Sequence, residues 1–159
     1  MKNKKKIIII SIIVCVIVGL ILVYIFSFSS NRYDIDSIKK QCLSFYDDKN
    51  LRVMDFIDMT ALFGTDFDDT SDAVFLSNIN IEQAYTDDTM MIVVINDENS
   101  KYYYDLLKSH IDSYLMYSED EILNKLYSNA ILVSGKDYVY LIVSNDAKTI
   151  EKEINMFYR

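Results

Sequence analysis

The chain has 159 residues, a formal net charge of −8, two cysteines and no proline or tryptophan. The charge is unevenly distributed, because residues 1–30 hold four lysines and no acidic residue (+4), whereas residues 31–159 carry −12. An acidic body lacks the clustered Lys and Arg that bind phosphates, which excludes a nucleic-acid-binding protein. Two cysteines cannot form the framework of a disulfide-rich protein.

Residues 7–28 form an uncharged, strongly apolar run of 22 residues. As an α-helix this run would be about 33 Å long at roughly 1.5 Å per residue, enough to cross a hydrocarbon core of about 30 Å. Four lysines precede the run, and positively charged flanks stay in the cytoplasm. We therefore expect a single-pass cell-membrane protein, with a cytoplasmic basic stub at residues 1–6 and its C-terminal part outside the cytoplasm.

Two alternatives to an uncleaved signal anchor remain open. One is a cleavable signal peptide with Ser27 and Ser29 beside the cut, but the run exceeds the apolar core of about 7–15 residues usual in such peptides. The other is a lipoprotein signal at Cys15, where Val14 occupies the place of the usual small residue. The length of the apolar run favours the anchor.

A short tether at residues 29–33 is expected to lead into one folded domain at residues 34–159, whose length suits a single core. For the short helix at 119–127, Ser118 and Glu121 match a capping box. Residues 51–56 are ambiguous. In chain order, the remaining patterns first predict a helix after the acidic caps at 34–36, a helical turn at 60–64 and strands at 74–76 and 90–95. They then predict a helix at 100–117 and a hairpin of strands at 130–133 and 138–143. The last predicted element is a helix capped by Asn145 or Asp146.

This order of elements predicts an α+β fold with two layers. Short strands in neighbouring pairs favour an antiparallel or mixed sheet of about four strands, with helices mainly on one face. The order of the strands within the sheet does not follow from the sequence.

The segments 130–133, 135 and 138–146 resemble the closing hairpin and helix start of a bacterial family, the domain of unknown function 4358 family. Leu62-Phe63-Gly64 and the strand at 90–95 occur in the matching order, so the resemblance covers about residues 35–155. The resemblance implies a membrane-tethered extracytoplasmic domain and offers no catalytic residues. Many members look like lipoproteins, whereas this chain looks like a signal anchor.

The densest acidic segment is a candidate cation site, and no other cofactor is expected. Hard cations such as calcium take several carboxylate oxygens from one flexible loop. The segment lacks the glycine and the glutamate that define an EF-hand loop, so a solvated acidic loop is the simpler interpretation. The candidate ligands are Asp66, Asp68, Asp69 and Asp72.

Three consecutive tyrosines, Tyr102, Tyr103 and Tyr104, lie in the helix predicted at 100–117. Successive helix residues diverge by about 100°, so at least one of these rings must face away from the core. Exposed tyrosines suit binding surfaces, and these three residues are the candidate interaction surface.

His110 is the only histidine, and its neighbour Ser109 points away from it on a helix, so the two are not a nucleophile and its base by adjacency. We expect His110 half-buried beside the apolar stripe of its helix. Cys42 is expected inside the first helix's apolar face, with an intermolecular disulfide as the alternative.

These features favour a membrane-anchored extracytoplasmic domain without enzymatic activity that binds an envelope protein or a cell-wall component. One alternative is a cation-responsive module that uses residues 66–72. The other is an envelope hydrolase built around His110.

Overall fold

The structure, a computed structural model, divides into two units at residues 1–31 and 32–159, a boundary inside the predicted tether. Of the first unit only residues 15–18 are described, and they are helical. Among the described residues no helix is both long and apolar enough to cross a membrane. The rest of the predicted span lies outside the described residues, which are 15–18, 32–64, 72–79 and 85–159.

The described part of the second unit contains five strands and six helical segments. In chain order these are α2 (Ile35–Phe45), η1 (Asp47–Lys49), β1 (Arg52–Val53), α3 (Phe56–Phe63), β2 (Asp72–Ser77), β3 (Met91–Asn96), α4 (Ser100–Tyr117), α5 (Glu121–Ser128), β4 (Ile131–Ser134), β5 (Val139–Val143) and α6 (Ala147–Asn155).

The five strands form one antiparallel sheet in the order β1-β2-β3-β5-β4. The helices α4 and α5 connect β3 to the edge strand β4, and the β4–β5 hairpin then returns β5 to the side of β3. In this register Val93 of β3 lies opposite Phe75 on one side and Leu141 on the other. The predicted hairpin is confirmed.

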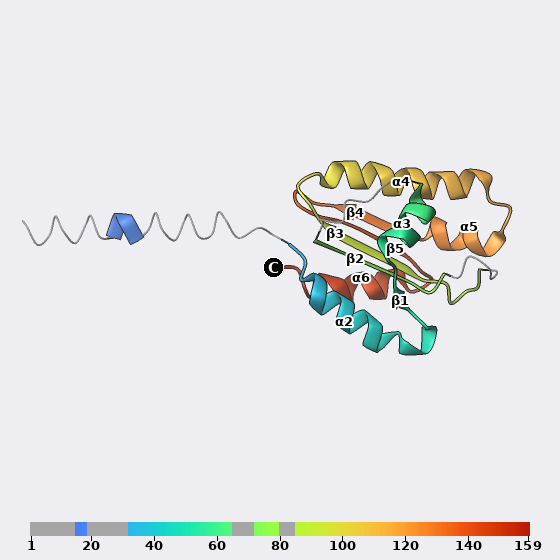
Figure 1. Cartoon of the computed structure of the whole chain (residues 1–159), viewed down its shortest axis with the longest axis horizontal. Helices are drawn as coiled ribbons and strands as arrows, with labels where there is room; N and C mark the ends of the chain where they lie inside the picture. The colour runs from blue at the N-terminus through green and yellow to red at the C-terminus, as the bar shows by residue number, and fades with distance from the viewer. Residues whose placement is uncertain (1–14, 19–31, 65–71, 80–84) are drawn as a thin grey trace, which may run out of the picture. The chain divides into compact units, whose positions relative to one another are not determined.

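Helices cover both faces of the sheet (Figure 1). On one face, side chains such as Val94 and Ile142 pack against α2 and α6. On the other face, Val93 and Leu141 pack against α3, α4 and α5. The α+β class is confirmed, but the prediction of two layers with helices mainly on one face is wrong, because the sheet and the helices on its two faces form three layers.

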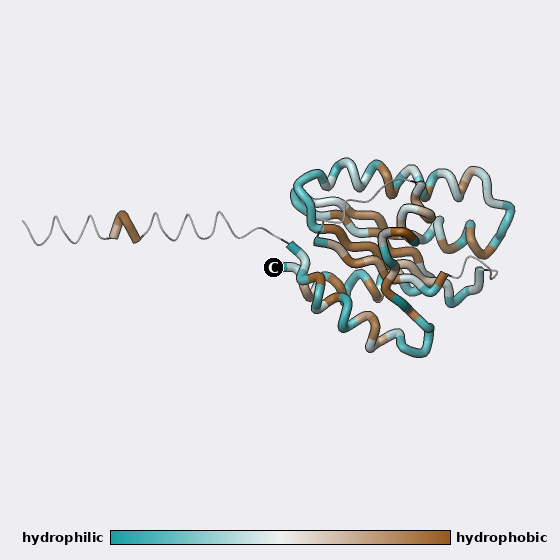
Figure 2. Tube along the Cα trace, in the orientation of Figure 1, coloured by the Kyte–Doolittle hydropathy of each residue, from teal (hydrophilic) through white to brown (hydrophobic). Residues whose placement is uncertain are grey.

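The number of strands also differs from the prediction of about four, because residues 52–53 add the short edge strand β1. The central strands β3 and β5 are buried at every position. Strands that helices cover on both faces need apolar side chains throughout rather than an alternating pattern. Figure 2 shows this apolar centre, with polar residues along much of the surrounding helices.

The two ends of the domain are joined to each other. The Arg32 N–H donates to the Arg159 carbonyl at 3.1 Å, and the Arg159 N–H donates back to Arg32 at 3.0 Å. The Asp34 N–H donates to the Phe157 carbonyl at 3.0 Å. The chain therefore enters the domain beside the point where it ends.

The start of α5 differs from the predicted capping box. The Asp120 carboxylate accepts the N–H groups of Ile122 and Leu123 at 2.9 and 3.1 Å. The Ser118 hydroxyl instead accepts the N–H of Asp120 at 3.1 Å. The helix cap is therefore Asp120, because its carboxylate reaches two N–H groups of the first turn that have no partner inside the helix.

Replacing Asp120 with alanine is expected to lower the free energy of unfolding by about 1 kcal/mol, the usual cost of a lost helix cap. Ser118→Ala should cost less, roughly 0.5 kcal/mol or below, because this hydroxyl does not bond to the helix. Urea unfolding of residues 32–159 followed by circular dichroism measures both values. If Ser118→Ala lowered the free energy of unfolding more than Asp120→Ala does, the capping box would be supported instead.

Candidate functional site

Of the candidate cation ligands, Asp66, Asp68 and Asp69 lie outside the described residues. Asp72 begins β2, where its carboxylate accepts the side-chain amide of Asn96 at 2.8 Å. Within the described ranges, no three His, Cys, Asp or Glu side chains are grouped so that they could hold a metal ion. The cation site therefore stays a prediction.

Asn96 connects Asp72 to the entry of the chain into the domain. Its side-chain amide donates to the Tyr33 carbonyl at 2.8 Å, and its side-chain oxygen accepts the Tyr33 N–H at 3.0 Å. Asn96 is buried, so these bonds satisfy polar groups that water does not reach. In this structure Asp72 belongs to a hydrogen-bonded network that holds Tyr33 in place.

The three consecutive tyrosines have different environments, as the helix geometry requires. Tyr103 is buried in the core beneath α4, whereas 54% of Tyr102 is exposed. Tyr104 is half-buried and lies beside a hollow between α4 and the edge strand β4. The expectation that at least one ring faces away from the core is confirmed by Tyr102, and the binding role of the three residues stays a prediction.

His110 lies in an aromatic cluster that joins three helices. Its ring is 4.4 Å from that of Phe63 on α3 and 4.7 Å from that of Tyr114 on α4, measured between centroids. Its Nε2 atom is 3.1 Å from the hydroxyl of Tyr127 on α5. Burial lowers the pKa of His110 from its usual 6.5 to about 4, so the ring is neutral at pH 7.

The expected half-buried position of His110 is confirmed, and the neighbouring Ser109 is exposed. The contacts of the histidine ring are those of a packing residue at the junction of α3, α4 and α5. They offer no support for a hydrolase built around His110.

Cys42 is buried on the inner face of α2, as its spacing predicts. Burial, with a smaller contribution from the charge of Glu153, raises the pKa of its thiol to about 12. A disulfide between two molecules would require this side chain to reach the surface, so the structure favours the buried interpretation.

A surface that the sequence analysis missed lies where α4 ends and α5 begins. Its exposed apolar side chains define what we call the α4–α5 patch: Leu115, Met116, Tyr117 and Ile122. Met116 is 71% exposed and Tyr117 is 79% exposed. The signal was present in the sequence, since three consecutive apolar residues on a helix cannot all face the core.

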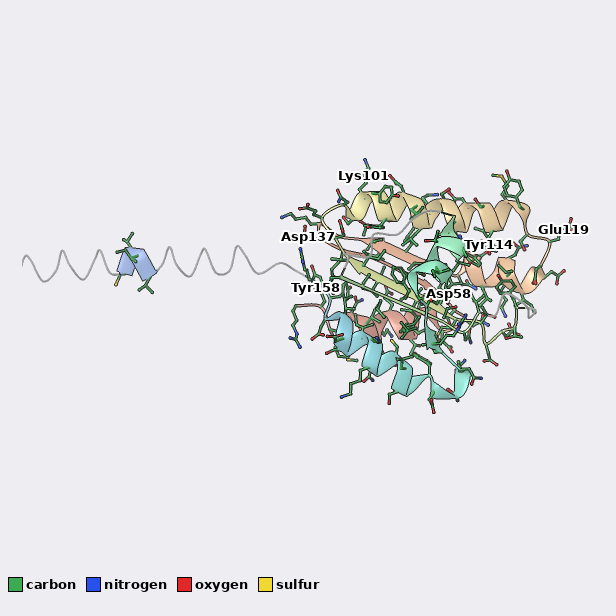
Figure 3. The ribbon with its side chains drawn as sticks, in the orientation of Figure 1. Asp58, Lys101, Tyr114, Glu119, Asp137 and Tyr158 are labelled. Atoms are coloured by element: carbon green, nitrogen blue, oxygen red, sulfur yellow. The ribbon has the colours of Figure 1, made fainter. Side chains whose placement is uncertain are left out.

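Two open hollows share Tyr117 in their lining. One, of about 330 Å³, is lined by α4 residues from Asp105 to Tyr117 and includes Met116. The other, of about 390 Å³, is lined by Tyr114, Tyr117 and Ser118. Figure 3 shows Tyr114 and Glu119 toward one end of the domain and Tyr158 at the other end.

The end of the domain that bears the patch is strongly acidic. Lys49 pairs with Asp88 at 3.0 Å and approaches Asp146 at 3.9 Å, and Lys125 pairs with Asp87 at 3.2 Å. These ion pairs connect η1, the turn at 86–89, α5 and the start of α6. We call the acids of these segments, together with the residues just before α5, the acidic pole: Asp47, Asp48, Asp87, Asp88, Glu119, Asp120, Glu121 and Asp146.

Only three lysines lie on the same segments as these eight carboxylates, namely Lys49, Lys125 and Lys148. Two of the three are already held in the ion pairs described above. The Lys125 ammonium, with the Asn145 amide, keeps the pKa of Asp87 below its usual value. The acidic pole therefore stays negatively charged at neutral pH.

Comparison of the chain with models of protein families, with curated proteins and with solved structures gives no match. The resemblance to the domain of unknown function 4358 family therefore stays a prediction.

Proposed function

We propose that the chain is a single-pass membrane protein that presents a non-enzymatic binding domain outside the cytoplasm. The apolar run at residues 7–28, preceded by four lysines, supports the anchor and its orientation. The division of the chain at residues 31 and 32 supports a folded domain that follows a short tether. This domain has apolar cores on both faces of its sheet, which its own helices cover.

The observation that carries the binding role is the exposure of the α4–α5 patch. Most large apolar side chains of the domain are buried, yet Met116 and Tyr117 project from the last turn of α4. Apolar side chains grouped at a surface and surrounded by polar residues are typical of protein interaction sites. An envelope protein or cell-wall component is the proposed partner class.

Cysteine labelling in intact cells tests the membrane topology. Cys42 is buried and should not react with a maleimide, so a Cys15→Ser chain provides a background without reactive thiols. Lys101→Cys, on the exposed side of α4 (Figure 3), should react with a membrane-impermeant maleimide in intact cells. Lys4→Cys, in the basic stub, should react only after the membrane is permeabilised.

The opposite labelling pattern would overturn the proposed orientation. The mass of the chain that keeps Cys15 separates the alternatives for residues 1–30, because a cleaved signal peptide would remove about the first 29 residues and a lipoprotein signal would remove the residues before Cys15. A full-length product that sediments with the membrane is the expected result.

A further inference from the structure

We infer that the α4–α5 patch is the docking site for a basic, amphipathic segment of a partner protein. The inference rests on the proposed binding function and specifies the surface and the chemistry of the partner. Its first support is the apolar content of the patch, since tyrosine and methionine are enriched where proteins bind one another. Tyr117 lines two open hollows, so a side chain of a partner can lie against its ring.

The second support is the charge beside the patch. Glu119 and Glu121 are exposed; Glu119 lies two residues after Tyr117, and Glu121 directly precedes Ile122. Among the described residues neither glutamate takes part in an ion pair. The nearby cations are engaged elsewhere: Lys108 pairs with Asp112, and Lys125 with Asp87.

The negative charge of the acidic pole also distinguishes between the possible partners of the α4–α5 patch. A second copy of this chain would bring an identical acidic pole against the first, and like charges facing each other oppose association. A bilayer of anionic lipid is disfavoured for the same reason. A segment with Lys or Arg beside an apolar face matches both parts of the surface, and an amphipathic helix in a groove is a common way to present them.

Binding of a defined peptide to the full chain tests this inference. The chain is placed in nanodiscs of phosphatidylcholine, a lipid without net charge, and empty nanodiscs serve as the blank. The probe is a fluorescent 14-residue helical peptide with leucine on one face and lysine on the other. Fluorescence anisotropy should show saturable binding, and a peptide with glutamate in place of each lysine should not bind.

Variants with matched controls locate the site. Met116→Ser combined with Tyr117→Ser should raise the Kd at least about tenfold, as should Glu119→Gln combined with Glu121→Gln. The controls replace similarly exposed residues elsewhere: Met156→Ser with Ile57→Ser, and Asp36→Asn with Glu98→Gln. These controls should change the Kd less than about twofold.

The inference is overturned if the lysine peptide does not bind, if the glutamate peptide binds equally well, or if the control variants weaken binding as much as the patch variants. Self-association that Met116→Ser and Tyr117→Ser abolish would assign the patch to a second copy instead. The cysteine-labelling result does not depend on any of these outcomes. Failure of the docking site and failure of the proposed topology are therefore distinguishable.

Discussion

Leu141→Ala and Ile142→Ala are each expected to destabilise the domain by about 2–5 kcal/mol, the usual cost of emptying a fully buried aliphatic position. The two residues are neighbours on β5, both are fully buried, and they point to opposite faces of the sheet. Leu141 contacts the core under α3, α4 and α5, and Ile142 contacts the core over α2 and α6. Helices on both faces make both substitutions costly.

Urea unfolding of residues 32–159 measures the two values. In a two-layer fold one of these neighbours would face solvent, and its replacement would change stability by roughly 0.5 kcal/mol or less. Val53→Ala, on the partly exposed edge strand β1, provides the control for such a small effect. One large and one small value for Leu141 and Ile142 would contradict the three-layer arrangement.

Acidification is expected to destabilise the domain through His110. The pKa of this ring is about 4 in the folded domain against 6.5 for a solvated histidine, so the unfolded chain binds the proton first. The stability that the domain has with a neutral His110 ring is fully present above pH 6.5 and is lost as the pH falls toward 4. The loss should be on the order of 1 kcal/mol at pH 5.5 and roughly 2–3 kcal/mol at pH 4.5.

His110→Phe separates this effect from the titration of carboxyl groups. Phenylalanine keeps an aromatic ring beside Phe63 and Tyr114 but has no proton to gain, and the carboxyl groups are common to both proteins. The free energy of unfolding is measured at pH 7.5, 5.5 and 4.5 for both. If the two pH profiles are parallel, His110 is not the buried neutral group that the structure shows.

Most secondary structure follows from local patterns. The helix predicted at 100–117 is α4 residue for residue. The strand predicted at 90–95 is shifted by one residue from β3, and the strand predicted at 138–143 begins one residue before β5. These segments have a strong apolar periodicity or a continuous apolar run, which is a local property. The short strand β1 was missed because its two residues are too few for any pattern.

The number of layers was mispredicted although the sequence held a signal for it. The strands β3 and β5, with sequences MIVVIN and VYLIV, lack the alternation of a strand that has one face in solvent. A continuous apolar strand is typical of a sheet with both faces covered. The prediction of an antiparallel or mixed sheet with helices mainly on one face rests on the short neighbouring strands and leaves the missing alternation unexplained.

The sequence predicts only in part which side chains of the candidate surfaces are exposed. Helix geometry requires that one of Tyr102, Tyr103 and Tyr104 faces outward, but only the tertiary structure shows that Tyr102 does. The same geometry applies to Leu115, Met116 and Tyr117, which no motif singles out. Their exposure depends on where α5 turns away from α4, and this is decided by contacts distant in the sequence.

The sequence by itself determined the division of charge, which is −12 for residues 31–159 and +4 for residues 1–30. It also determined the apolar run that is long enough to cross a membrane. These are properties of composition and order, which folding does not change. Only the tertiary structure decided that three layers form, and that the ion pairs of Lys49 and Lys125 bring Asp87, Asp88 and Asp146 together from distant segments. The physical reason is that burial and local charge depend on which elements pack together, and this packing is set by long-range contacts.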